Sequence, residues 1–588
     1  MKTGRWAAIG GLIGAAAFVL AACGSTTAST SSTQALLQKQ NTMVTALPVG
    51  VGITDFAPIA NASAYSIYNS QVEYMMWAPL VMVSGQDTID WADSIAKSIT
   101  PSNNDQTFTV SLKNWNWSNG KPITAQDVAF TANLVLQACT VTNPPYSYGG
   151  CGFGGIPQIS GHPQLKSVTV SGNDVVFTTS APANPTWFEL NALGQIQPMP
   201  QSVWDKGSVT QDLTFLKSVY NQPTAAAYKV ISGPYKFDSF VNNQYWKFSP
   251  NASYGGPKAT INVTMQYEAS DQAEFAALKT QKINAGYLTA TLYGSANQLT
   301  KNYVLTKSQG FCWYGVMINS AKDTLDVGPA FQDPKVRQAL EYGIDQNAIG
   351  KVLDGTLNGQ NMWIPNYSAI PSGFPNLTQA VFGTSSIPNP YPFSIAKGKA
   401  LLEAAGYKLV NGVMTKGSIK LSFPVNIDAS STETQNAALI LQQDWKQMGV
   451  DIQINPMAFD SMIALSDAQP GTSSKWAVNW SGGWCYEPNF YPTGGGMWQY
   501  YNSEDNFNLA GAFTHFNSAV QQSYAPGTAA QAQQNMLAYA NATATDLPQL
   551  WMPGGYTVDE TAPYIHGTTK WFNPVQAFTQ WNHLTISH

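Results

Sequence analysis

The spacing of apolar residues predicts alternating helices and strands along most of the chain, and one segment shows both patterns in succession. Its first apolar residues recur three or four positions apart, as on the buried face of a helix: Ala438, Leu441, Trp445 and Met448. The next ones alternate with polar residues, as in a half-buried strand: Val450, Ile452 and Ile454. Gly449 separates the two runs and is expected to end the helix. A helix that leads directly into a strand is typical of an α/β lobe that contains a sheet.

Capping residues mark the starts of further helices. Thr124 and Asp127 stand in the spacing of a capping box and predict a helix that runs to about residue 139. Ser394 is expected to open a helix over 395–405, which Gly406 would end. Three more sites carry N-cap residue types before a periodic apolar run: Asp333, Asp345 and the segment 430–433.

The first residues have the pattern of an export signal. Lys2 and Arg5 precede an uncharged apolar run over 6–20, which at about 15 residues is too short to span a bilayer comfortably. The run leads into Leu-Ala-Ala-Cys, ending at Cys23, and this resembles the lipobox of bacterial lipoproteins. We therefore expect 1–22 to be a signal peptide, Cys23 to carry a lipid, and 23–41 to be a flexible tether. The alternative is an ordinary secretory signal that happens to contain a cysteine. No later stretch has the length and apolarity of a transmembrane helix.

Composition and charge exclude some functions. Hydrophobic residues make up 44% of the chain and aromatic residues 12%, which is sufficient for several cores. Charged residues make up only 11%, against a usual share of about 25%. The formal net charge is -5 and no basic stripe occurs, so a nucleic-acid partner is not expected.

Five cysteines are present, and an exported protein meets an oxidising environment. If Cys23 carries lipid, four remain, and four cysteines can pair in three ways. Cys139 and Cys151 stand twelve residues apart around a Pro- and Gly-containing loop, which a disulfide could close. Some cysteines could instead be small buried hydrophobic residues. The absence of a Cys-x-x-Cys cluster speaks against a zinc site.

Several segments, in order along the chain, resemble one family. Residues 108–130 contain a strand, a Trp-x-Asn-Gly turn at 117–120 and a Thr-Ala-x-Asp-Val helix start, and 233–237 contain Gly-Pro-Tyr. Residues 331–345 contain Val-Arg-Gln-Ala-Leu and Ile-Asp, and 396–407 contain a further match. Together they resemble the peptide/nickel class of ABC-transporter substrate-binding proteins, the family of the oligopeptide- and dipeptide-binding lipoproteins. Most of these motif residues are expected to be structural: Asn119 and Gly120 in a hairpin, Asp127 in a cap, and Arg337 in an ion pair that stabilises a lobe.

The resemblance implies an α/β, two-lobed periplasmic-binding-protein-like fold with a hinge and an extra subdomain inserted in the first lobe. Lobe I would comprise three segments: 42–86, 201–311 and 546–588. The inserted subdomain would be 87–200, and lobe II would be 312–545. The chain would cross between the lobes near 311 and 545, so that closure could bury a ligand without melting either core.

The same resemblance implies where the ligand binds. In oligopeptide-binding relatives a Cys-x-Asp follows a Gly-Trp; the cysteine forms a disulfide within the second lobe, and the Asp binds the peptide ammonium group. Here this implies a Cys312–Cys485 disulfide, with Glu487 two positions after Cys485 as the ammonium ligand. Aromatic residues and two residues of a first ligand-side loop complete the expected site: Trp484, Tyr486, Phe459, Tyr65 and Asn61. Glu487 and Pro488 could equally match a later acidic position of the family, in which case a neutral solute becomes the expected ligand.

The expected function is therefore capture of a solute, most simply short peptides, and delivery to an ABC permease and its ATPase. We expect an extracytoplasmic monomer that is anchored to the membrane by lipid and has no cofactor. Alternatives are a binder of oligosaccharides, opine-like compounds or nickel chelates, and a ligand sensor. A secreted hydrolase is the least favoured alternative. No His-Glu-x-x-His or Gly-x-Ser-x-Gly motif occurs, and no histidine cluster that would bind nickel directly.

Overall fold

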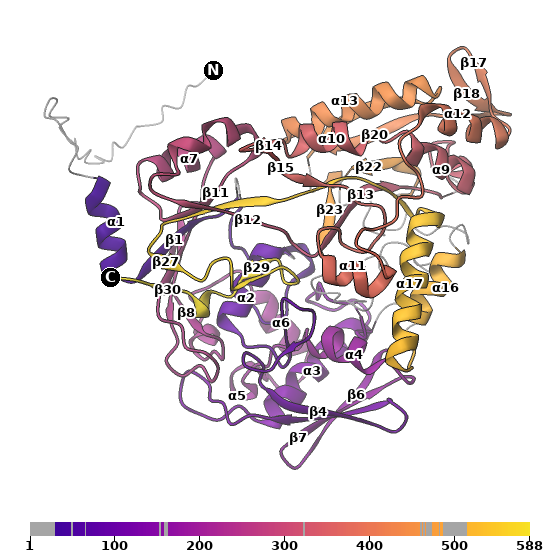
Figure 1. The fold of residues 1–588 in the computed structure, drawn as a ribbon. Coiled ribbons are helices and arrows are strands. Elements are labelled where there is room, and N and C mark those ends of the chain that lie inside the picture. Colours follow the sequence, from indigo (N-terminus) through magenta and orange to yellow (C-terminus); the bar gives the residue numbers. More distant parts are fainter. Residues whose placement is uncertain are drawn as a thin grey trace, which may run out of the picture.

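Two sheets organise the protein, with a smaller one beside them (Figure 1). The computed structural model describes residues 30–48, 51–64, 66–151, 154–157, 163–321, 324–458, 461–462, 465, 473–480, 482–485 and 514–588. The first sheet has seven strands in the order β12-β26-β11-β1-β10-β9-β8. Their bounds are β1 (Thr42–Ala46), β8 (Tyr235–Val241), β9 (Tyr245–Pro250), β10 (Asn262–Gln266), β11 (Ala285–Tyr287), β12 (Val304–Ser308) and β26 (Thr557–Thr561). This sheet is the core of lobe I.

The second sheet belongs to lobe II. It has six strands, with the order β21-β20-β22-β13-β23 and β24 paired to β13. The bounds are β13 (Cys312–Ile318), β20 (Ser422–Asp428), β21 (Asp451–Met457), β22 (Val478–Trp480), β23 (Gly483–Cys485) and β24 (Gln549–Trp551). Helix α13 (Thr432–Gln447) packs on β20 and β21 and on α10 (Gln346–Leu353). The helix–turn–strand segment that ends at β21 confirms the prediction from apolar spacing.

The inserted subdomain carries the third sheet, in the order β4-β5-β7-β6. Its strands are β4 (Ala96–Ser102), β5 (Thr107–Leu112), β6 (Leu165–Ser171) and β7 (Asp174–Thr179). Helix α3 (Ala125–Thr140) covers β6 and β7 and starts with the predicted capping box between Thr124 and Asp127. In Figure 1 this subdomain lies at the end of the molecule opposite to α13.

The other predicted helix starts are confirmed. Side chains of Asp333, Asp345 and Ser394 accept hydrogen bonds from backbone N–H groups at the starts of α9 (Pro334–Tyr342), α10 and α12 (Ile395–Ala404). Arg337 on α9 is buried and donates to the backbone carbonyls of Phe331, Gln332 and Asp546. Its role is therefore structural, as expected.

Helix α1 (Thr30–Lys39) lies where the sequence predicted a flexible tether. The Gln34 side chain donates to the carbonyls of Gln281 and Ile283, at 2.9 and 2.8 Å, and Leu37 packs against the hydrophobic cluster of lobe I. The tether prediction for 23–41 is wrong over this helix, because contacts with lobe I compensate for its weak helix-forming composition.

The chain crosses between the two main sheets twice. Residues 309–311 join β12 to β13, close to the crossing expected near 311. The return crossing comprises 552–556, because β24 at Gln549–Trp551 still pairs with β13. Lobe II therefore extends beyond the predicted boundary at 545. Helix α17 (Ala529–Asp546), which precedes β24, packs on α16 (Thr514–Ser523).

Lobe II also contacts the inserted subdomain away from these crossings. Asn184 donates its backbone N–H to the carbonyl of Tyr524, at 2.9 Å, and the Tyr524 ring lies 5.2 Å from that of Trp187. Figure 1 shows α16 and α17 reaching from lobe II toward α4 (Pro185–Phe188).

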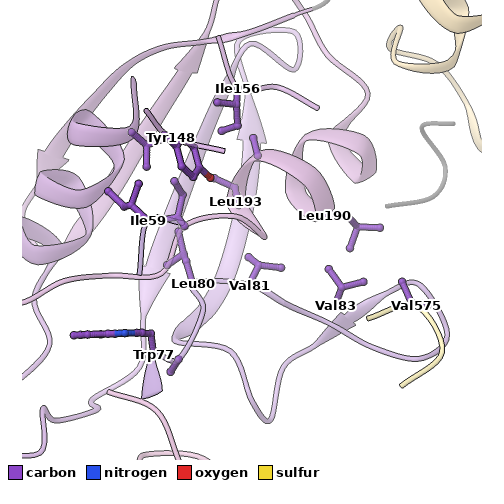
Figure 2. Packing of buried hydrophobic residues seen from close by; sticks show 14 of the residues in the cluster. Ile59, Trp77, Leu80, Val81, Val83, Tyr148, Ile156, Leu190, Leu193 and Val575 are labelled. Carbon is purple, nitrogen blue, oxygen red and sulfur yellow. The ribbon is translucent and has the colours of Figure 1, made fainter. Parts of the chain in front are cut away.

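A continuous hydrophobic core joins lobe I, the inserted subdomain and part of lobe II, to which β13, β24, α16 and α17 contribute. Figure 2 shows part of it, where Trp77, Leu80 and Val81 lie among residues of the subdomain such as Ile156 and Leu193. The rest of lobe II packs around Trp445, whose indole N–H donates to the carbonyl of Leu340 at 3.1 Å.

Both predicted disulfides are present. Cys139 at the end of α3 is bonded to Cys151, with 5.3 Å between Cα atoms. Cys312 and Cys485 face each other in the pairing of β13 with β23 and are also bonded. The second bond holds one edge of the lobe II sheet close to the crossing at 309–311.

Candidate ligand-binding site

A cavity of about 710 Å³ lies between the two main sheets. Lobe I contributes residues of β1, β11 and β26 and of helix α2 (Ile67–Met76). Lobe II contributes residues of β13, β22 and β23, the end of α10 and the start of α13. Both chain crossings also border the cavity, at Gly310 and at the segment from Pro553 to Tyr556. A molecule that fills this cavity would touch both lobes and the connections between them.

Tyr314 forms part of the lobe II wall. Its ring lies between Gly483 and Gly554, and a Cβ atom at either glycine would collide with it. Burial raises the pKa of Tyr314, so its phenol stays protonated and can donate a hydrogen bond. The two glycines thus position an aromatic ring with a polar tip at the cavity.

One carboxylate of lobe II, Asp354, lies near this ring, and a second one, Glu433, lies near Asp354. Asp354 is the C-cap residue of α10, and Glu433 lies in the first turn of α13, the helix packed against α10. The Asp354 carboxyl lies against Gly555, where a Cβ atom would collide with it. Burial, together with repulsion from Glu433, raises the pKa of Asp354 to about 7. Within the part of the chain that the structure describes, neither carboxylate has a hydrogen bond or an ion pair.

Lobe I supplies two further carboxylates to the cavity. Asp559 on β26 accepts a hydrogen bond from the Ser308 hydroxyl at 2.7 Å, and burial raises its pKa. Asp271, the first residue of α7 (Asp271–Lys279), accepts one from the Tyr287 hydroxyl at 3.4 Å. Among the described residues that line the cavity there is no Lys, Arg or His. The cavity is therefore acidic, with aromatic rings between its carboxylates.

A smaller cavity of about 380 Å³ adjoins the first and shares Asp559, Tyr556 and Trp581 with it. It contains one cation, Lys307, whose ammonium group lies 3.5 Å from the centre of the Tyr556 ring. This contact holds the ammonium group over an aromatic face that borders both cavities.

The structure tests few of the predicted ligand contacts. Four lie outside the described residues: Glu487, Tyr486, Phe459 and Tyr65. Trp484 lies in β23 opposite Trp313, and its side chain is outside the described part. Asn61 is buried away from the cavity: it accepts hydrogen bonds from Ser63 and forms a β-bridge with Tyr148 of the inserted subdomain.

Sequence reasoning missed the carboxylates that the fold brings together. Asp354 and Glu433 are far apart along the chain, and each has an ordinary helix-end position. Only the packing of α10 on α13 places them in one wall. The one local signal is Gly554 followed by Gly555, which permits close approach to the backbone.

Two lobes built on separate sheets, a double chain crossing and a cavity between the sheets define the class of solute-binding proteins. A family model described as bacterial extracellular solute-binding proteins, family 5 Middle, matches residues 91–502. The chain belongs to this family. The resemblance noted from the sequence is thereby confirmed, as is the expectation of a binding protein rather than an enzyme. Among the described residues, no helix is both long enough and apolar enough to cross a membrane.

Relatives at the sequence level are peptide-binding proteins. The oligopeptide-binding protein AppA of Bacillus subtilis is 24% identical over 394 residues, which are 66% of this chain and 65% of the relative. The oligopeptide-binding protein OppA of Lactococcus lactis subsp. cremoris is 24% identical over 425 residues, or 68% of each chain. The chain thus aligns with about two thirds of these relatives' length.

Solved structures share the fold over nearly the whole chain. AppA of Bacillus subtilis in complex with a nonapeptide has a TM-score of 0.70 at 18% identity, covering 93% of this chain and 99% of the other. NikA of Brucella suis in complex with Fe(III)-EDTA has a TM-score of 0.71 at 16% identity, covering 93% and 100%. At such identities the similarity establishes the two-lobed fold but does not identify the ligand.

Proposed function

We propose that the protein binds short peptides and delivers them, as a monomer, to the permease and ATPase of an ABC importer. The observation that carries this proposal is the cavity between the sheets, to which both lobes contribute. Its volume of about 710 Å³ falls within the range of about 300–1,000 Å³ typical of ligand pockets. The names of the relatives, which are oligopeptide- and dipeptide-binding proteins, support peptides as the ligand class.

Ligand binding would change the angle between the two lobes by rotation about the two chain crossings. Only residues 309–311 and 552–556 connect the two main sheets covalently, so rotation about them can change the opening of the cavity. A ligand that touches both walls binds the closed form better and shifts the population toward it. The closed, loaded form is the one that an importer would recognise.

Native mass spectrometry of the purified protein tests the ligand class. We expect co-purified peptides, and calorimetric titration of ligand-free protein with a mixture of short peptides should give saturable binding. If oligosaccharides or metal chelates co-purify and short peptides do not bind, a different solute is the cargo. The described residues favour neither direct metal binding nor a metal cluster, since no three metal-ligating side chains converge among them.

We also propose that Cys23 is lipidated and anchors the protein to the membrane. The proposal rests on the Leu-Ala-Ala-Cys sequence after a short apolar run. A lipid anchor would hold the protein near its importer without a spanning helix. Replacing Cys23 by Ser should move the protein from the membrane fraction to the medium or periplasm, and mass spectrometry should find no acyl chains. Equal membrane retention of both forms, without acylation, would refute the anchor.

A further inference from the structure

Helix α1 connects the proposed lipid anchor to the body of lobe I. Besides its contacts with residues 281–283, Gln34 accepts a hydrogen bond from the Tyr564 hydroxyl. One turn later, the Gln38 side chain donates to the carbonyl of Ser587 at 2.6 Å. In Figure 1, α1 lies beside β1 with the C-terminus at its end, on the side of lobe I away from α16 and α17. The helix is therefore bound to lobe I and does not act as a free tether.

The docking of α1 shortens the free chain between Cys23 and the folded protein. Six residues, 24–29, separate Cys23 from the first residue of α1. Such a segment spans at most about 25 Å in any conformation, whereas 24–41 as a whole spans up to about 65 Å. A folded chain of this length has a radius of gyration of about 25 Å. With the short segment the protein cannot turn its far side toward the membrane, whereas with the long one it can.

The surface around α1 suits an anionic lipid surface. Leu36 on α1 is 52% exposed. Three exposed lysines lie around the helix: Lys39 at its C-terminal end, Lys279 at the end of α7, and Lys282 in the turn that α1 contacts. Glu268 offsets part of the charge of Lys282. An exposed apolar side chain among lysines binds the headgroup layer of anionic phospholipids, and here it occurs in a chain whose net charge is -5.

We propose that α1 fixes the orientation of the protein on the membrane, with the α1 side of lobe I against anionic phospholipid headgroups and lobe II directed away from them. The proposal rests on the lipidation of Cys23 proposed above and does not depend on which solute the cavity binds. Leu36 enters the headgroup layer, and the three lysines contact the lipid phosphates. The importer therefore meets a binding protein whose cavity has a set direction relative to the bilayer.

Lysine footprinting tests this orientation. Lipidated protein on vesicles of phosphatidylcholine and phosphatidylglycerol, and soluble Cys23→Ser protein, are treated with an amine-reactive reagent that does not cross membranes. Mass spectrometry then measures the modification of each lysine. On the vesicles, modification of the three lysines near α1 should fall by about 5-fold, which corresponds to about 1 kcal/mol for a lysine at an anionic surface.

Lysines at the other side of the molecule are the internal control. Strands β17 (Lys408–Val410), β18 (Val413–Lys416) and β19 (Ile419–Lys420) form a small sheet of lobe II, and Figure 1 shows β17 and β18 on the side opposite to α1. Their exposed lysines should react equally in both forms: Lys408, Lys416 and Lys420. Equal modification of both sets on the vesicles, or protection of the lobe II set, would overturn the proposal.

Variants separate the docking of α1 from the anchor itself. Gln34→Ala combined with Leu37→Ser removes contacts that hold the helix, so Lys279 and Lys282 should lose their protection while the protein stays on the vesicles. A flexible Gly-Ser insert of about 12 residues after Ser25 leaves the fold untouched and should have the same effect. Gln40→Ala, which removes an exposed glutamine beside the helix, is the matched control and should keep the protection. Wild-type protection in both the undocked and the lengthened protein would show that α1 does not set the orientation.

The outcome is independent of the other proposals. If Cys23 carries no acyl chains in cells, the anchor proposal fails, and a maleimide-linked phospholipid coupled to Cys23 tests the orientation alone. Cys23 is the one cysteine outside the two disulfides. The same footprint on the coupled protein supports the role of α1, and an even footprint overturns it. Concentration-dependent protection of the α1 side in soluble Cys23→Ser protein would mean that a second copy covers this face, and would also overturn it. Peptide binding is measured on that soluble form, so its absence would refute the proposed ligand and not the orientation.

Discussion

Acidification from pH 7 to pH 5 should raise the free energy of unfolding by at least about 3 kcal/mol. Among the buried carboxyls of the described residues, three glutamates have the most strongly raised pKa values: Glu274, Glu341 and Glu560. Burial raises their pKa values to about 8, 8 and 9. In the unfolded chain a glutamate has a pKa of about 4.3, so between that value and pH 8 the folded state binds more protons than the unfolded state. Stability therefore falls as the pH rises, by about 1.4 kcal/mol per pH unit for each such group.

Chemical denaturation at a series of pH values measures this slope. Glu560→Gln should stabilise the protein at pH 8 and change little at pH 5, since neither carboxyl oxygen of Glu560 has a hydrogen-bond partner among the described residues. Asp205→Asn is the control, because it removes a carboxyl whose pKa is lowered rather than raised. That carboxyl is exposed, and hydrogen bonds from Gln201 and from the Gly207 N–H lower its pKa, so the variant should not reduce the slope. Stability that is flat or rising from pH 5 to pH 8 would contradict the prediction.

Backbone geometry explains why the carboxyls of Glu274 and Glu560 lie close together. Gly286 stands opposite Glu560 in the pairing of β11 with β26. The Glu274 carboxyl occupies the space that a side chain at Gly286 would fill, and it accepts a hydrogen bond from the Tyr287 N–H at 3.0 Å. Glu274 and Glu560 thus lie on one side of the sheet. Repulsion from Glu274 adds to the effect of burial on the pKa of Glu560, and repulsion from Glu268 and Asp271 adds to it for Glu274.

Removal of the Cys312–Cys485 disulfide should lower the free energy of unfolding by about 2–5 kcal/mol. The bond closes a loop of 173 residues, whereas Cys139–Cys151 closes one of 12. In the chain-entropy account a longer loop restricts the unfolded chain more, so Cys312→Ser with Cys485→Ser should cost more than Cys139→Ser with Cys151→Ser. Denaturation of both double variants, beside oxidised wild type, measures the difference. Equal stability of the Cys312–Cys485 variant and the oxidised wild type would contradict this expectation.

Local chemistry made much of the fold predictable. The capping box at Thr124 and Asp127 acts over three residues, and the helix–strand segment that ends at β21 shows its apolar period directly. The two disulfide pairings followed from spacing in one case and from family resemblance in the other. Such features depend on residues that are neighbours in the sequence or on known family motifs. They can therefore be predicted without knowing how distant segments pack together.

The rest depended on contacts between distant segments. Helix α1 has a Ser-, Thr- and Gln-rich sequence with little tendency to fold alone, and its docking to residues 281–283 of lobe I could not be inferred from it. The return crossing was predicted near residue 545, but the structure places it at 552–556, because β24 joins the second sheet by pairing with β13. Asp354 and Glu433 became a candidate site only when α10 packed on α13.

The position of β26 has a consequence for biosynthesis. This strand lies inside the lobe I sheet, between β11 and β12, yet it follows every other strand of that sheet in the sequence and is translated after them. Until it arrives, the facing edges of β11 and β12 have no partner, and unpaired edges favour aggregation. A nascent chain of this protein therefore cannot complete its first lobe before residues 557–561 have been synthesised. A premature stop shortly before residue 557 should therefore prevent the first lobe from folding, although it leaves every other strand of that sheet in the chain.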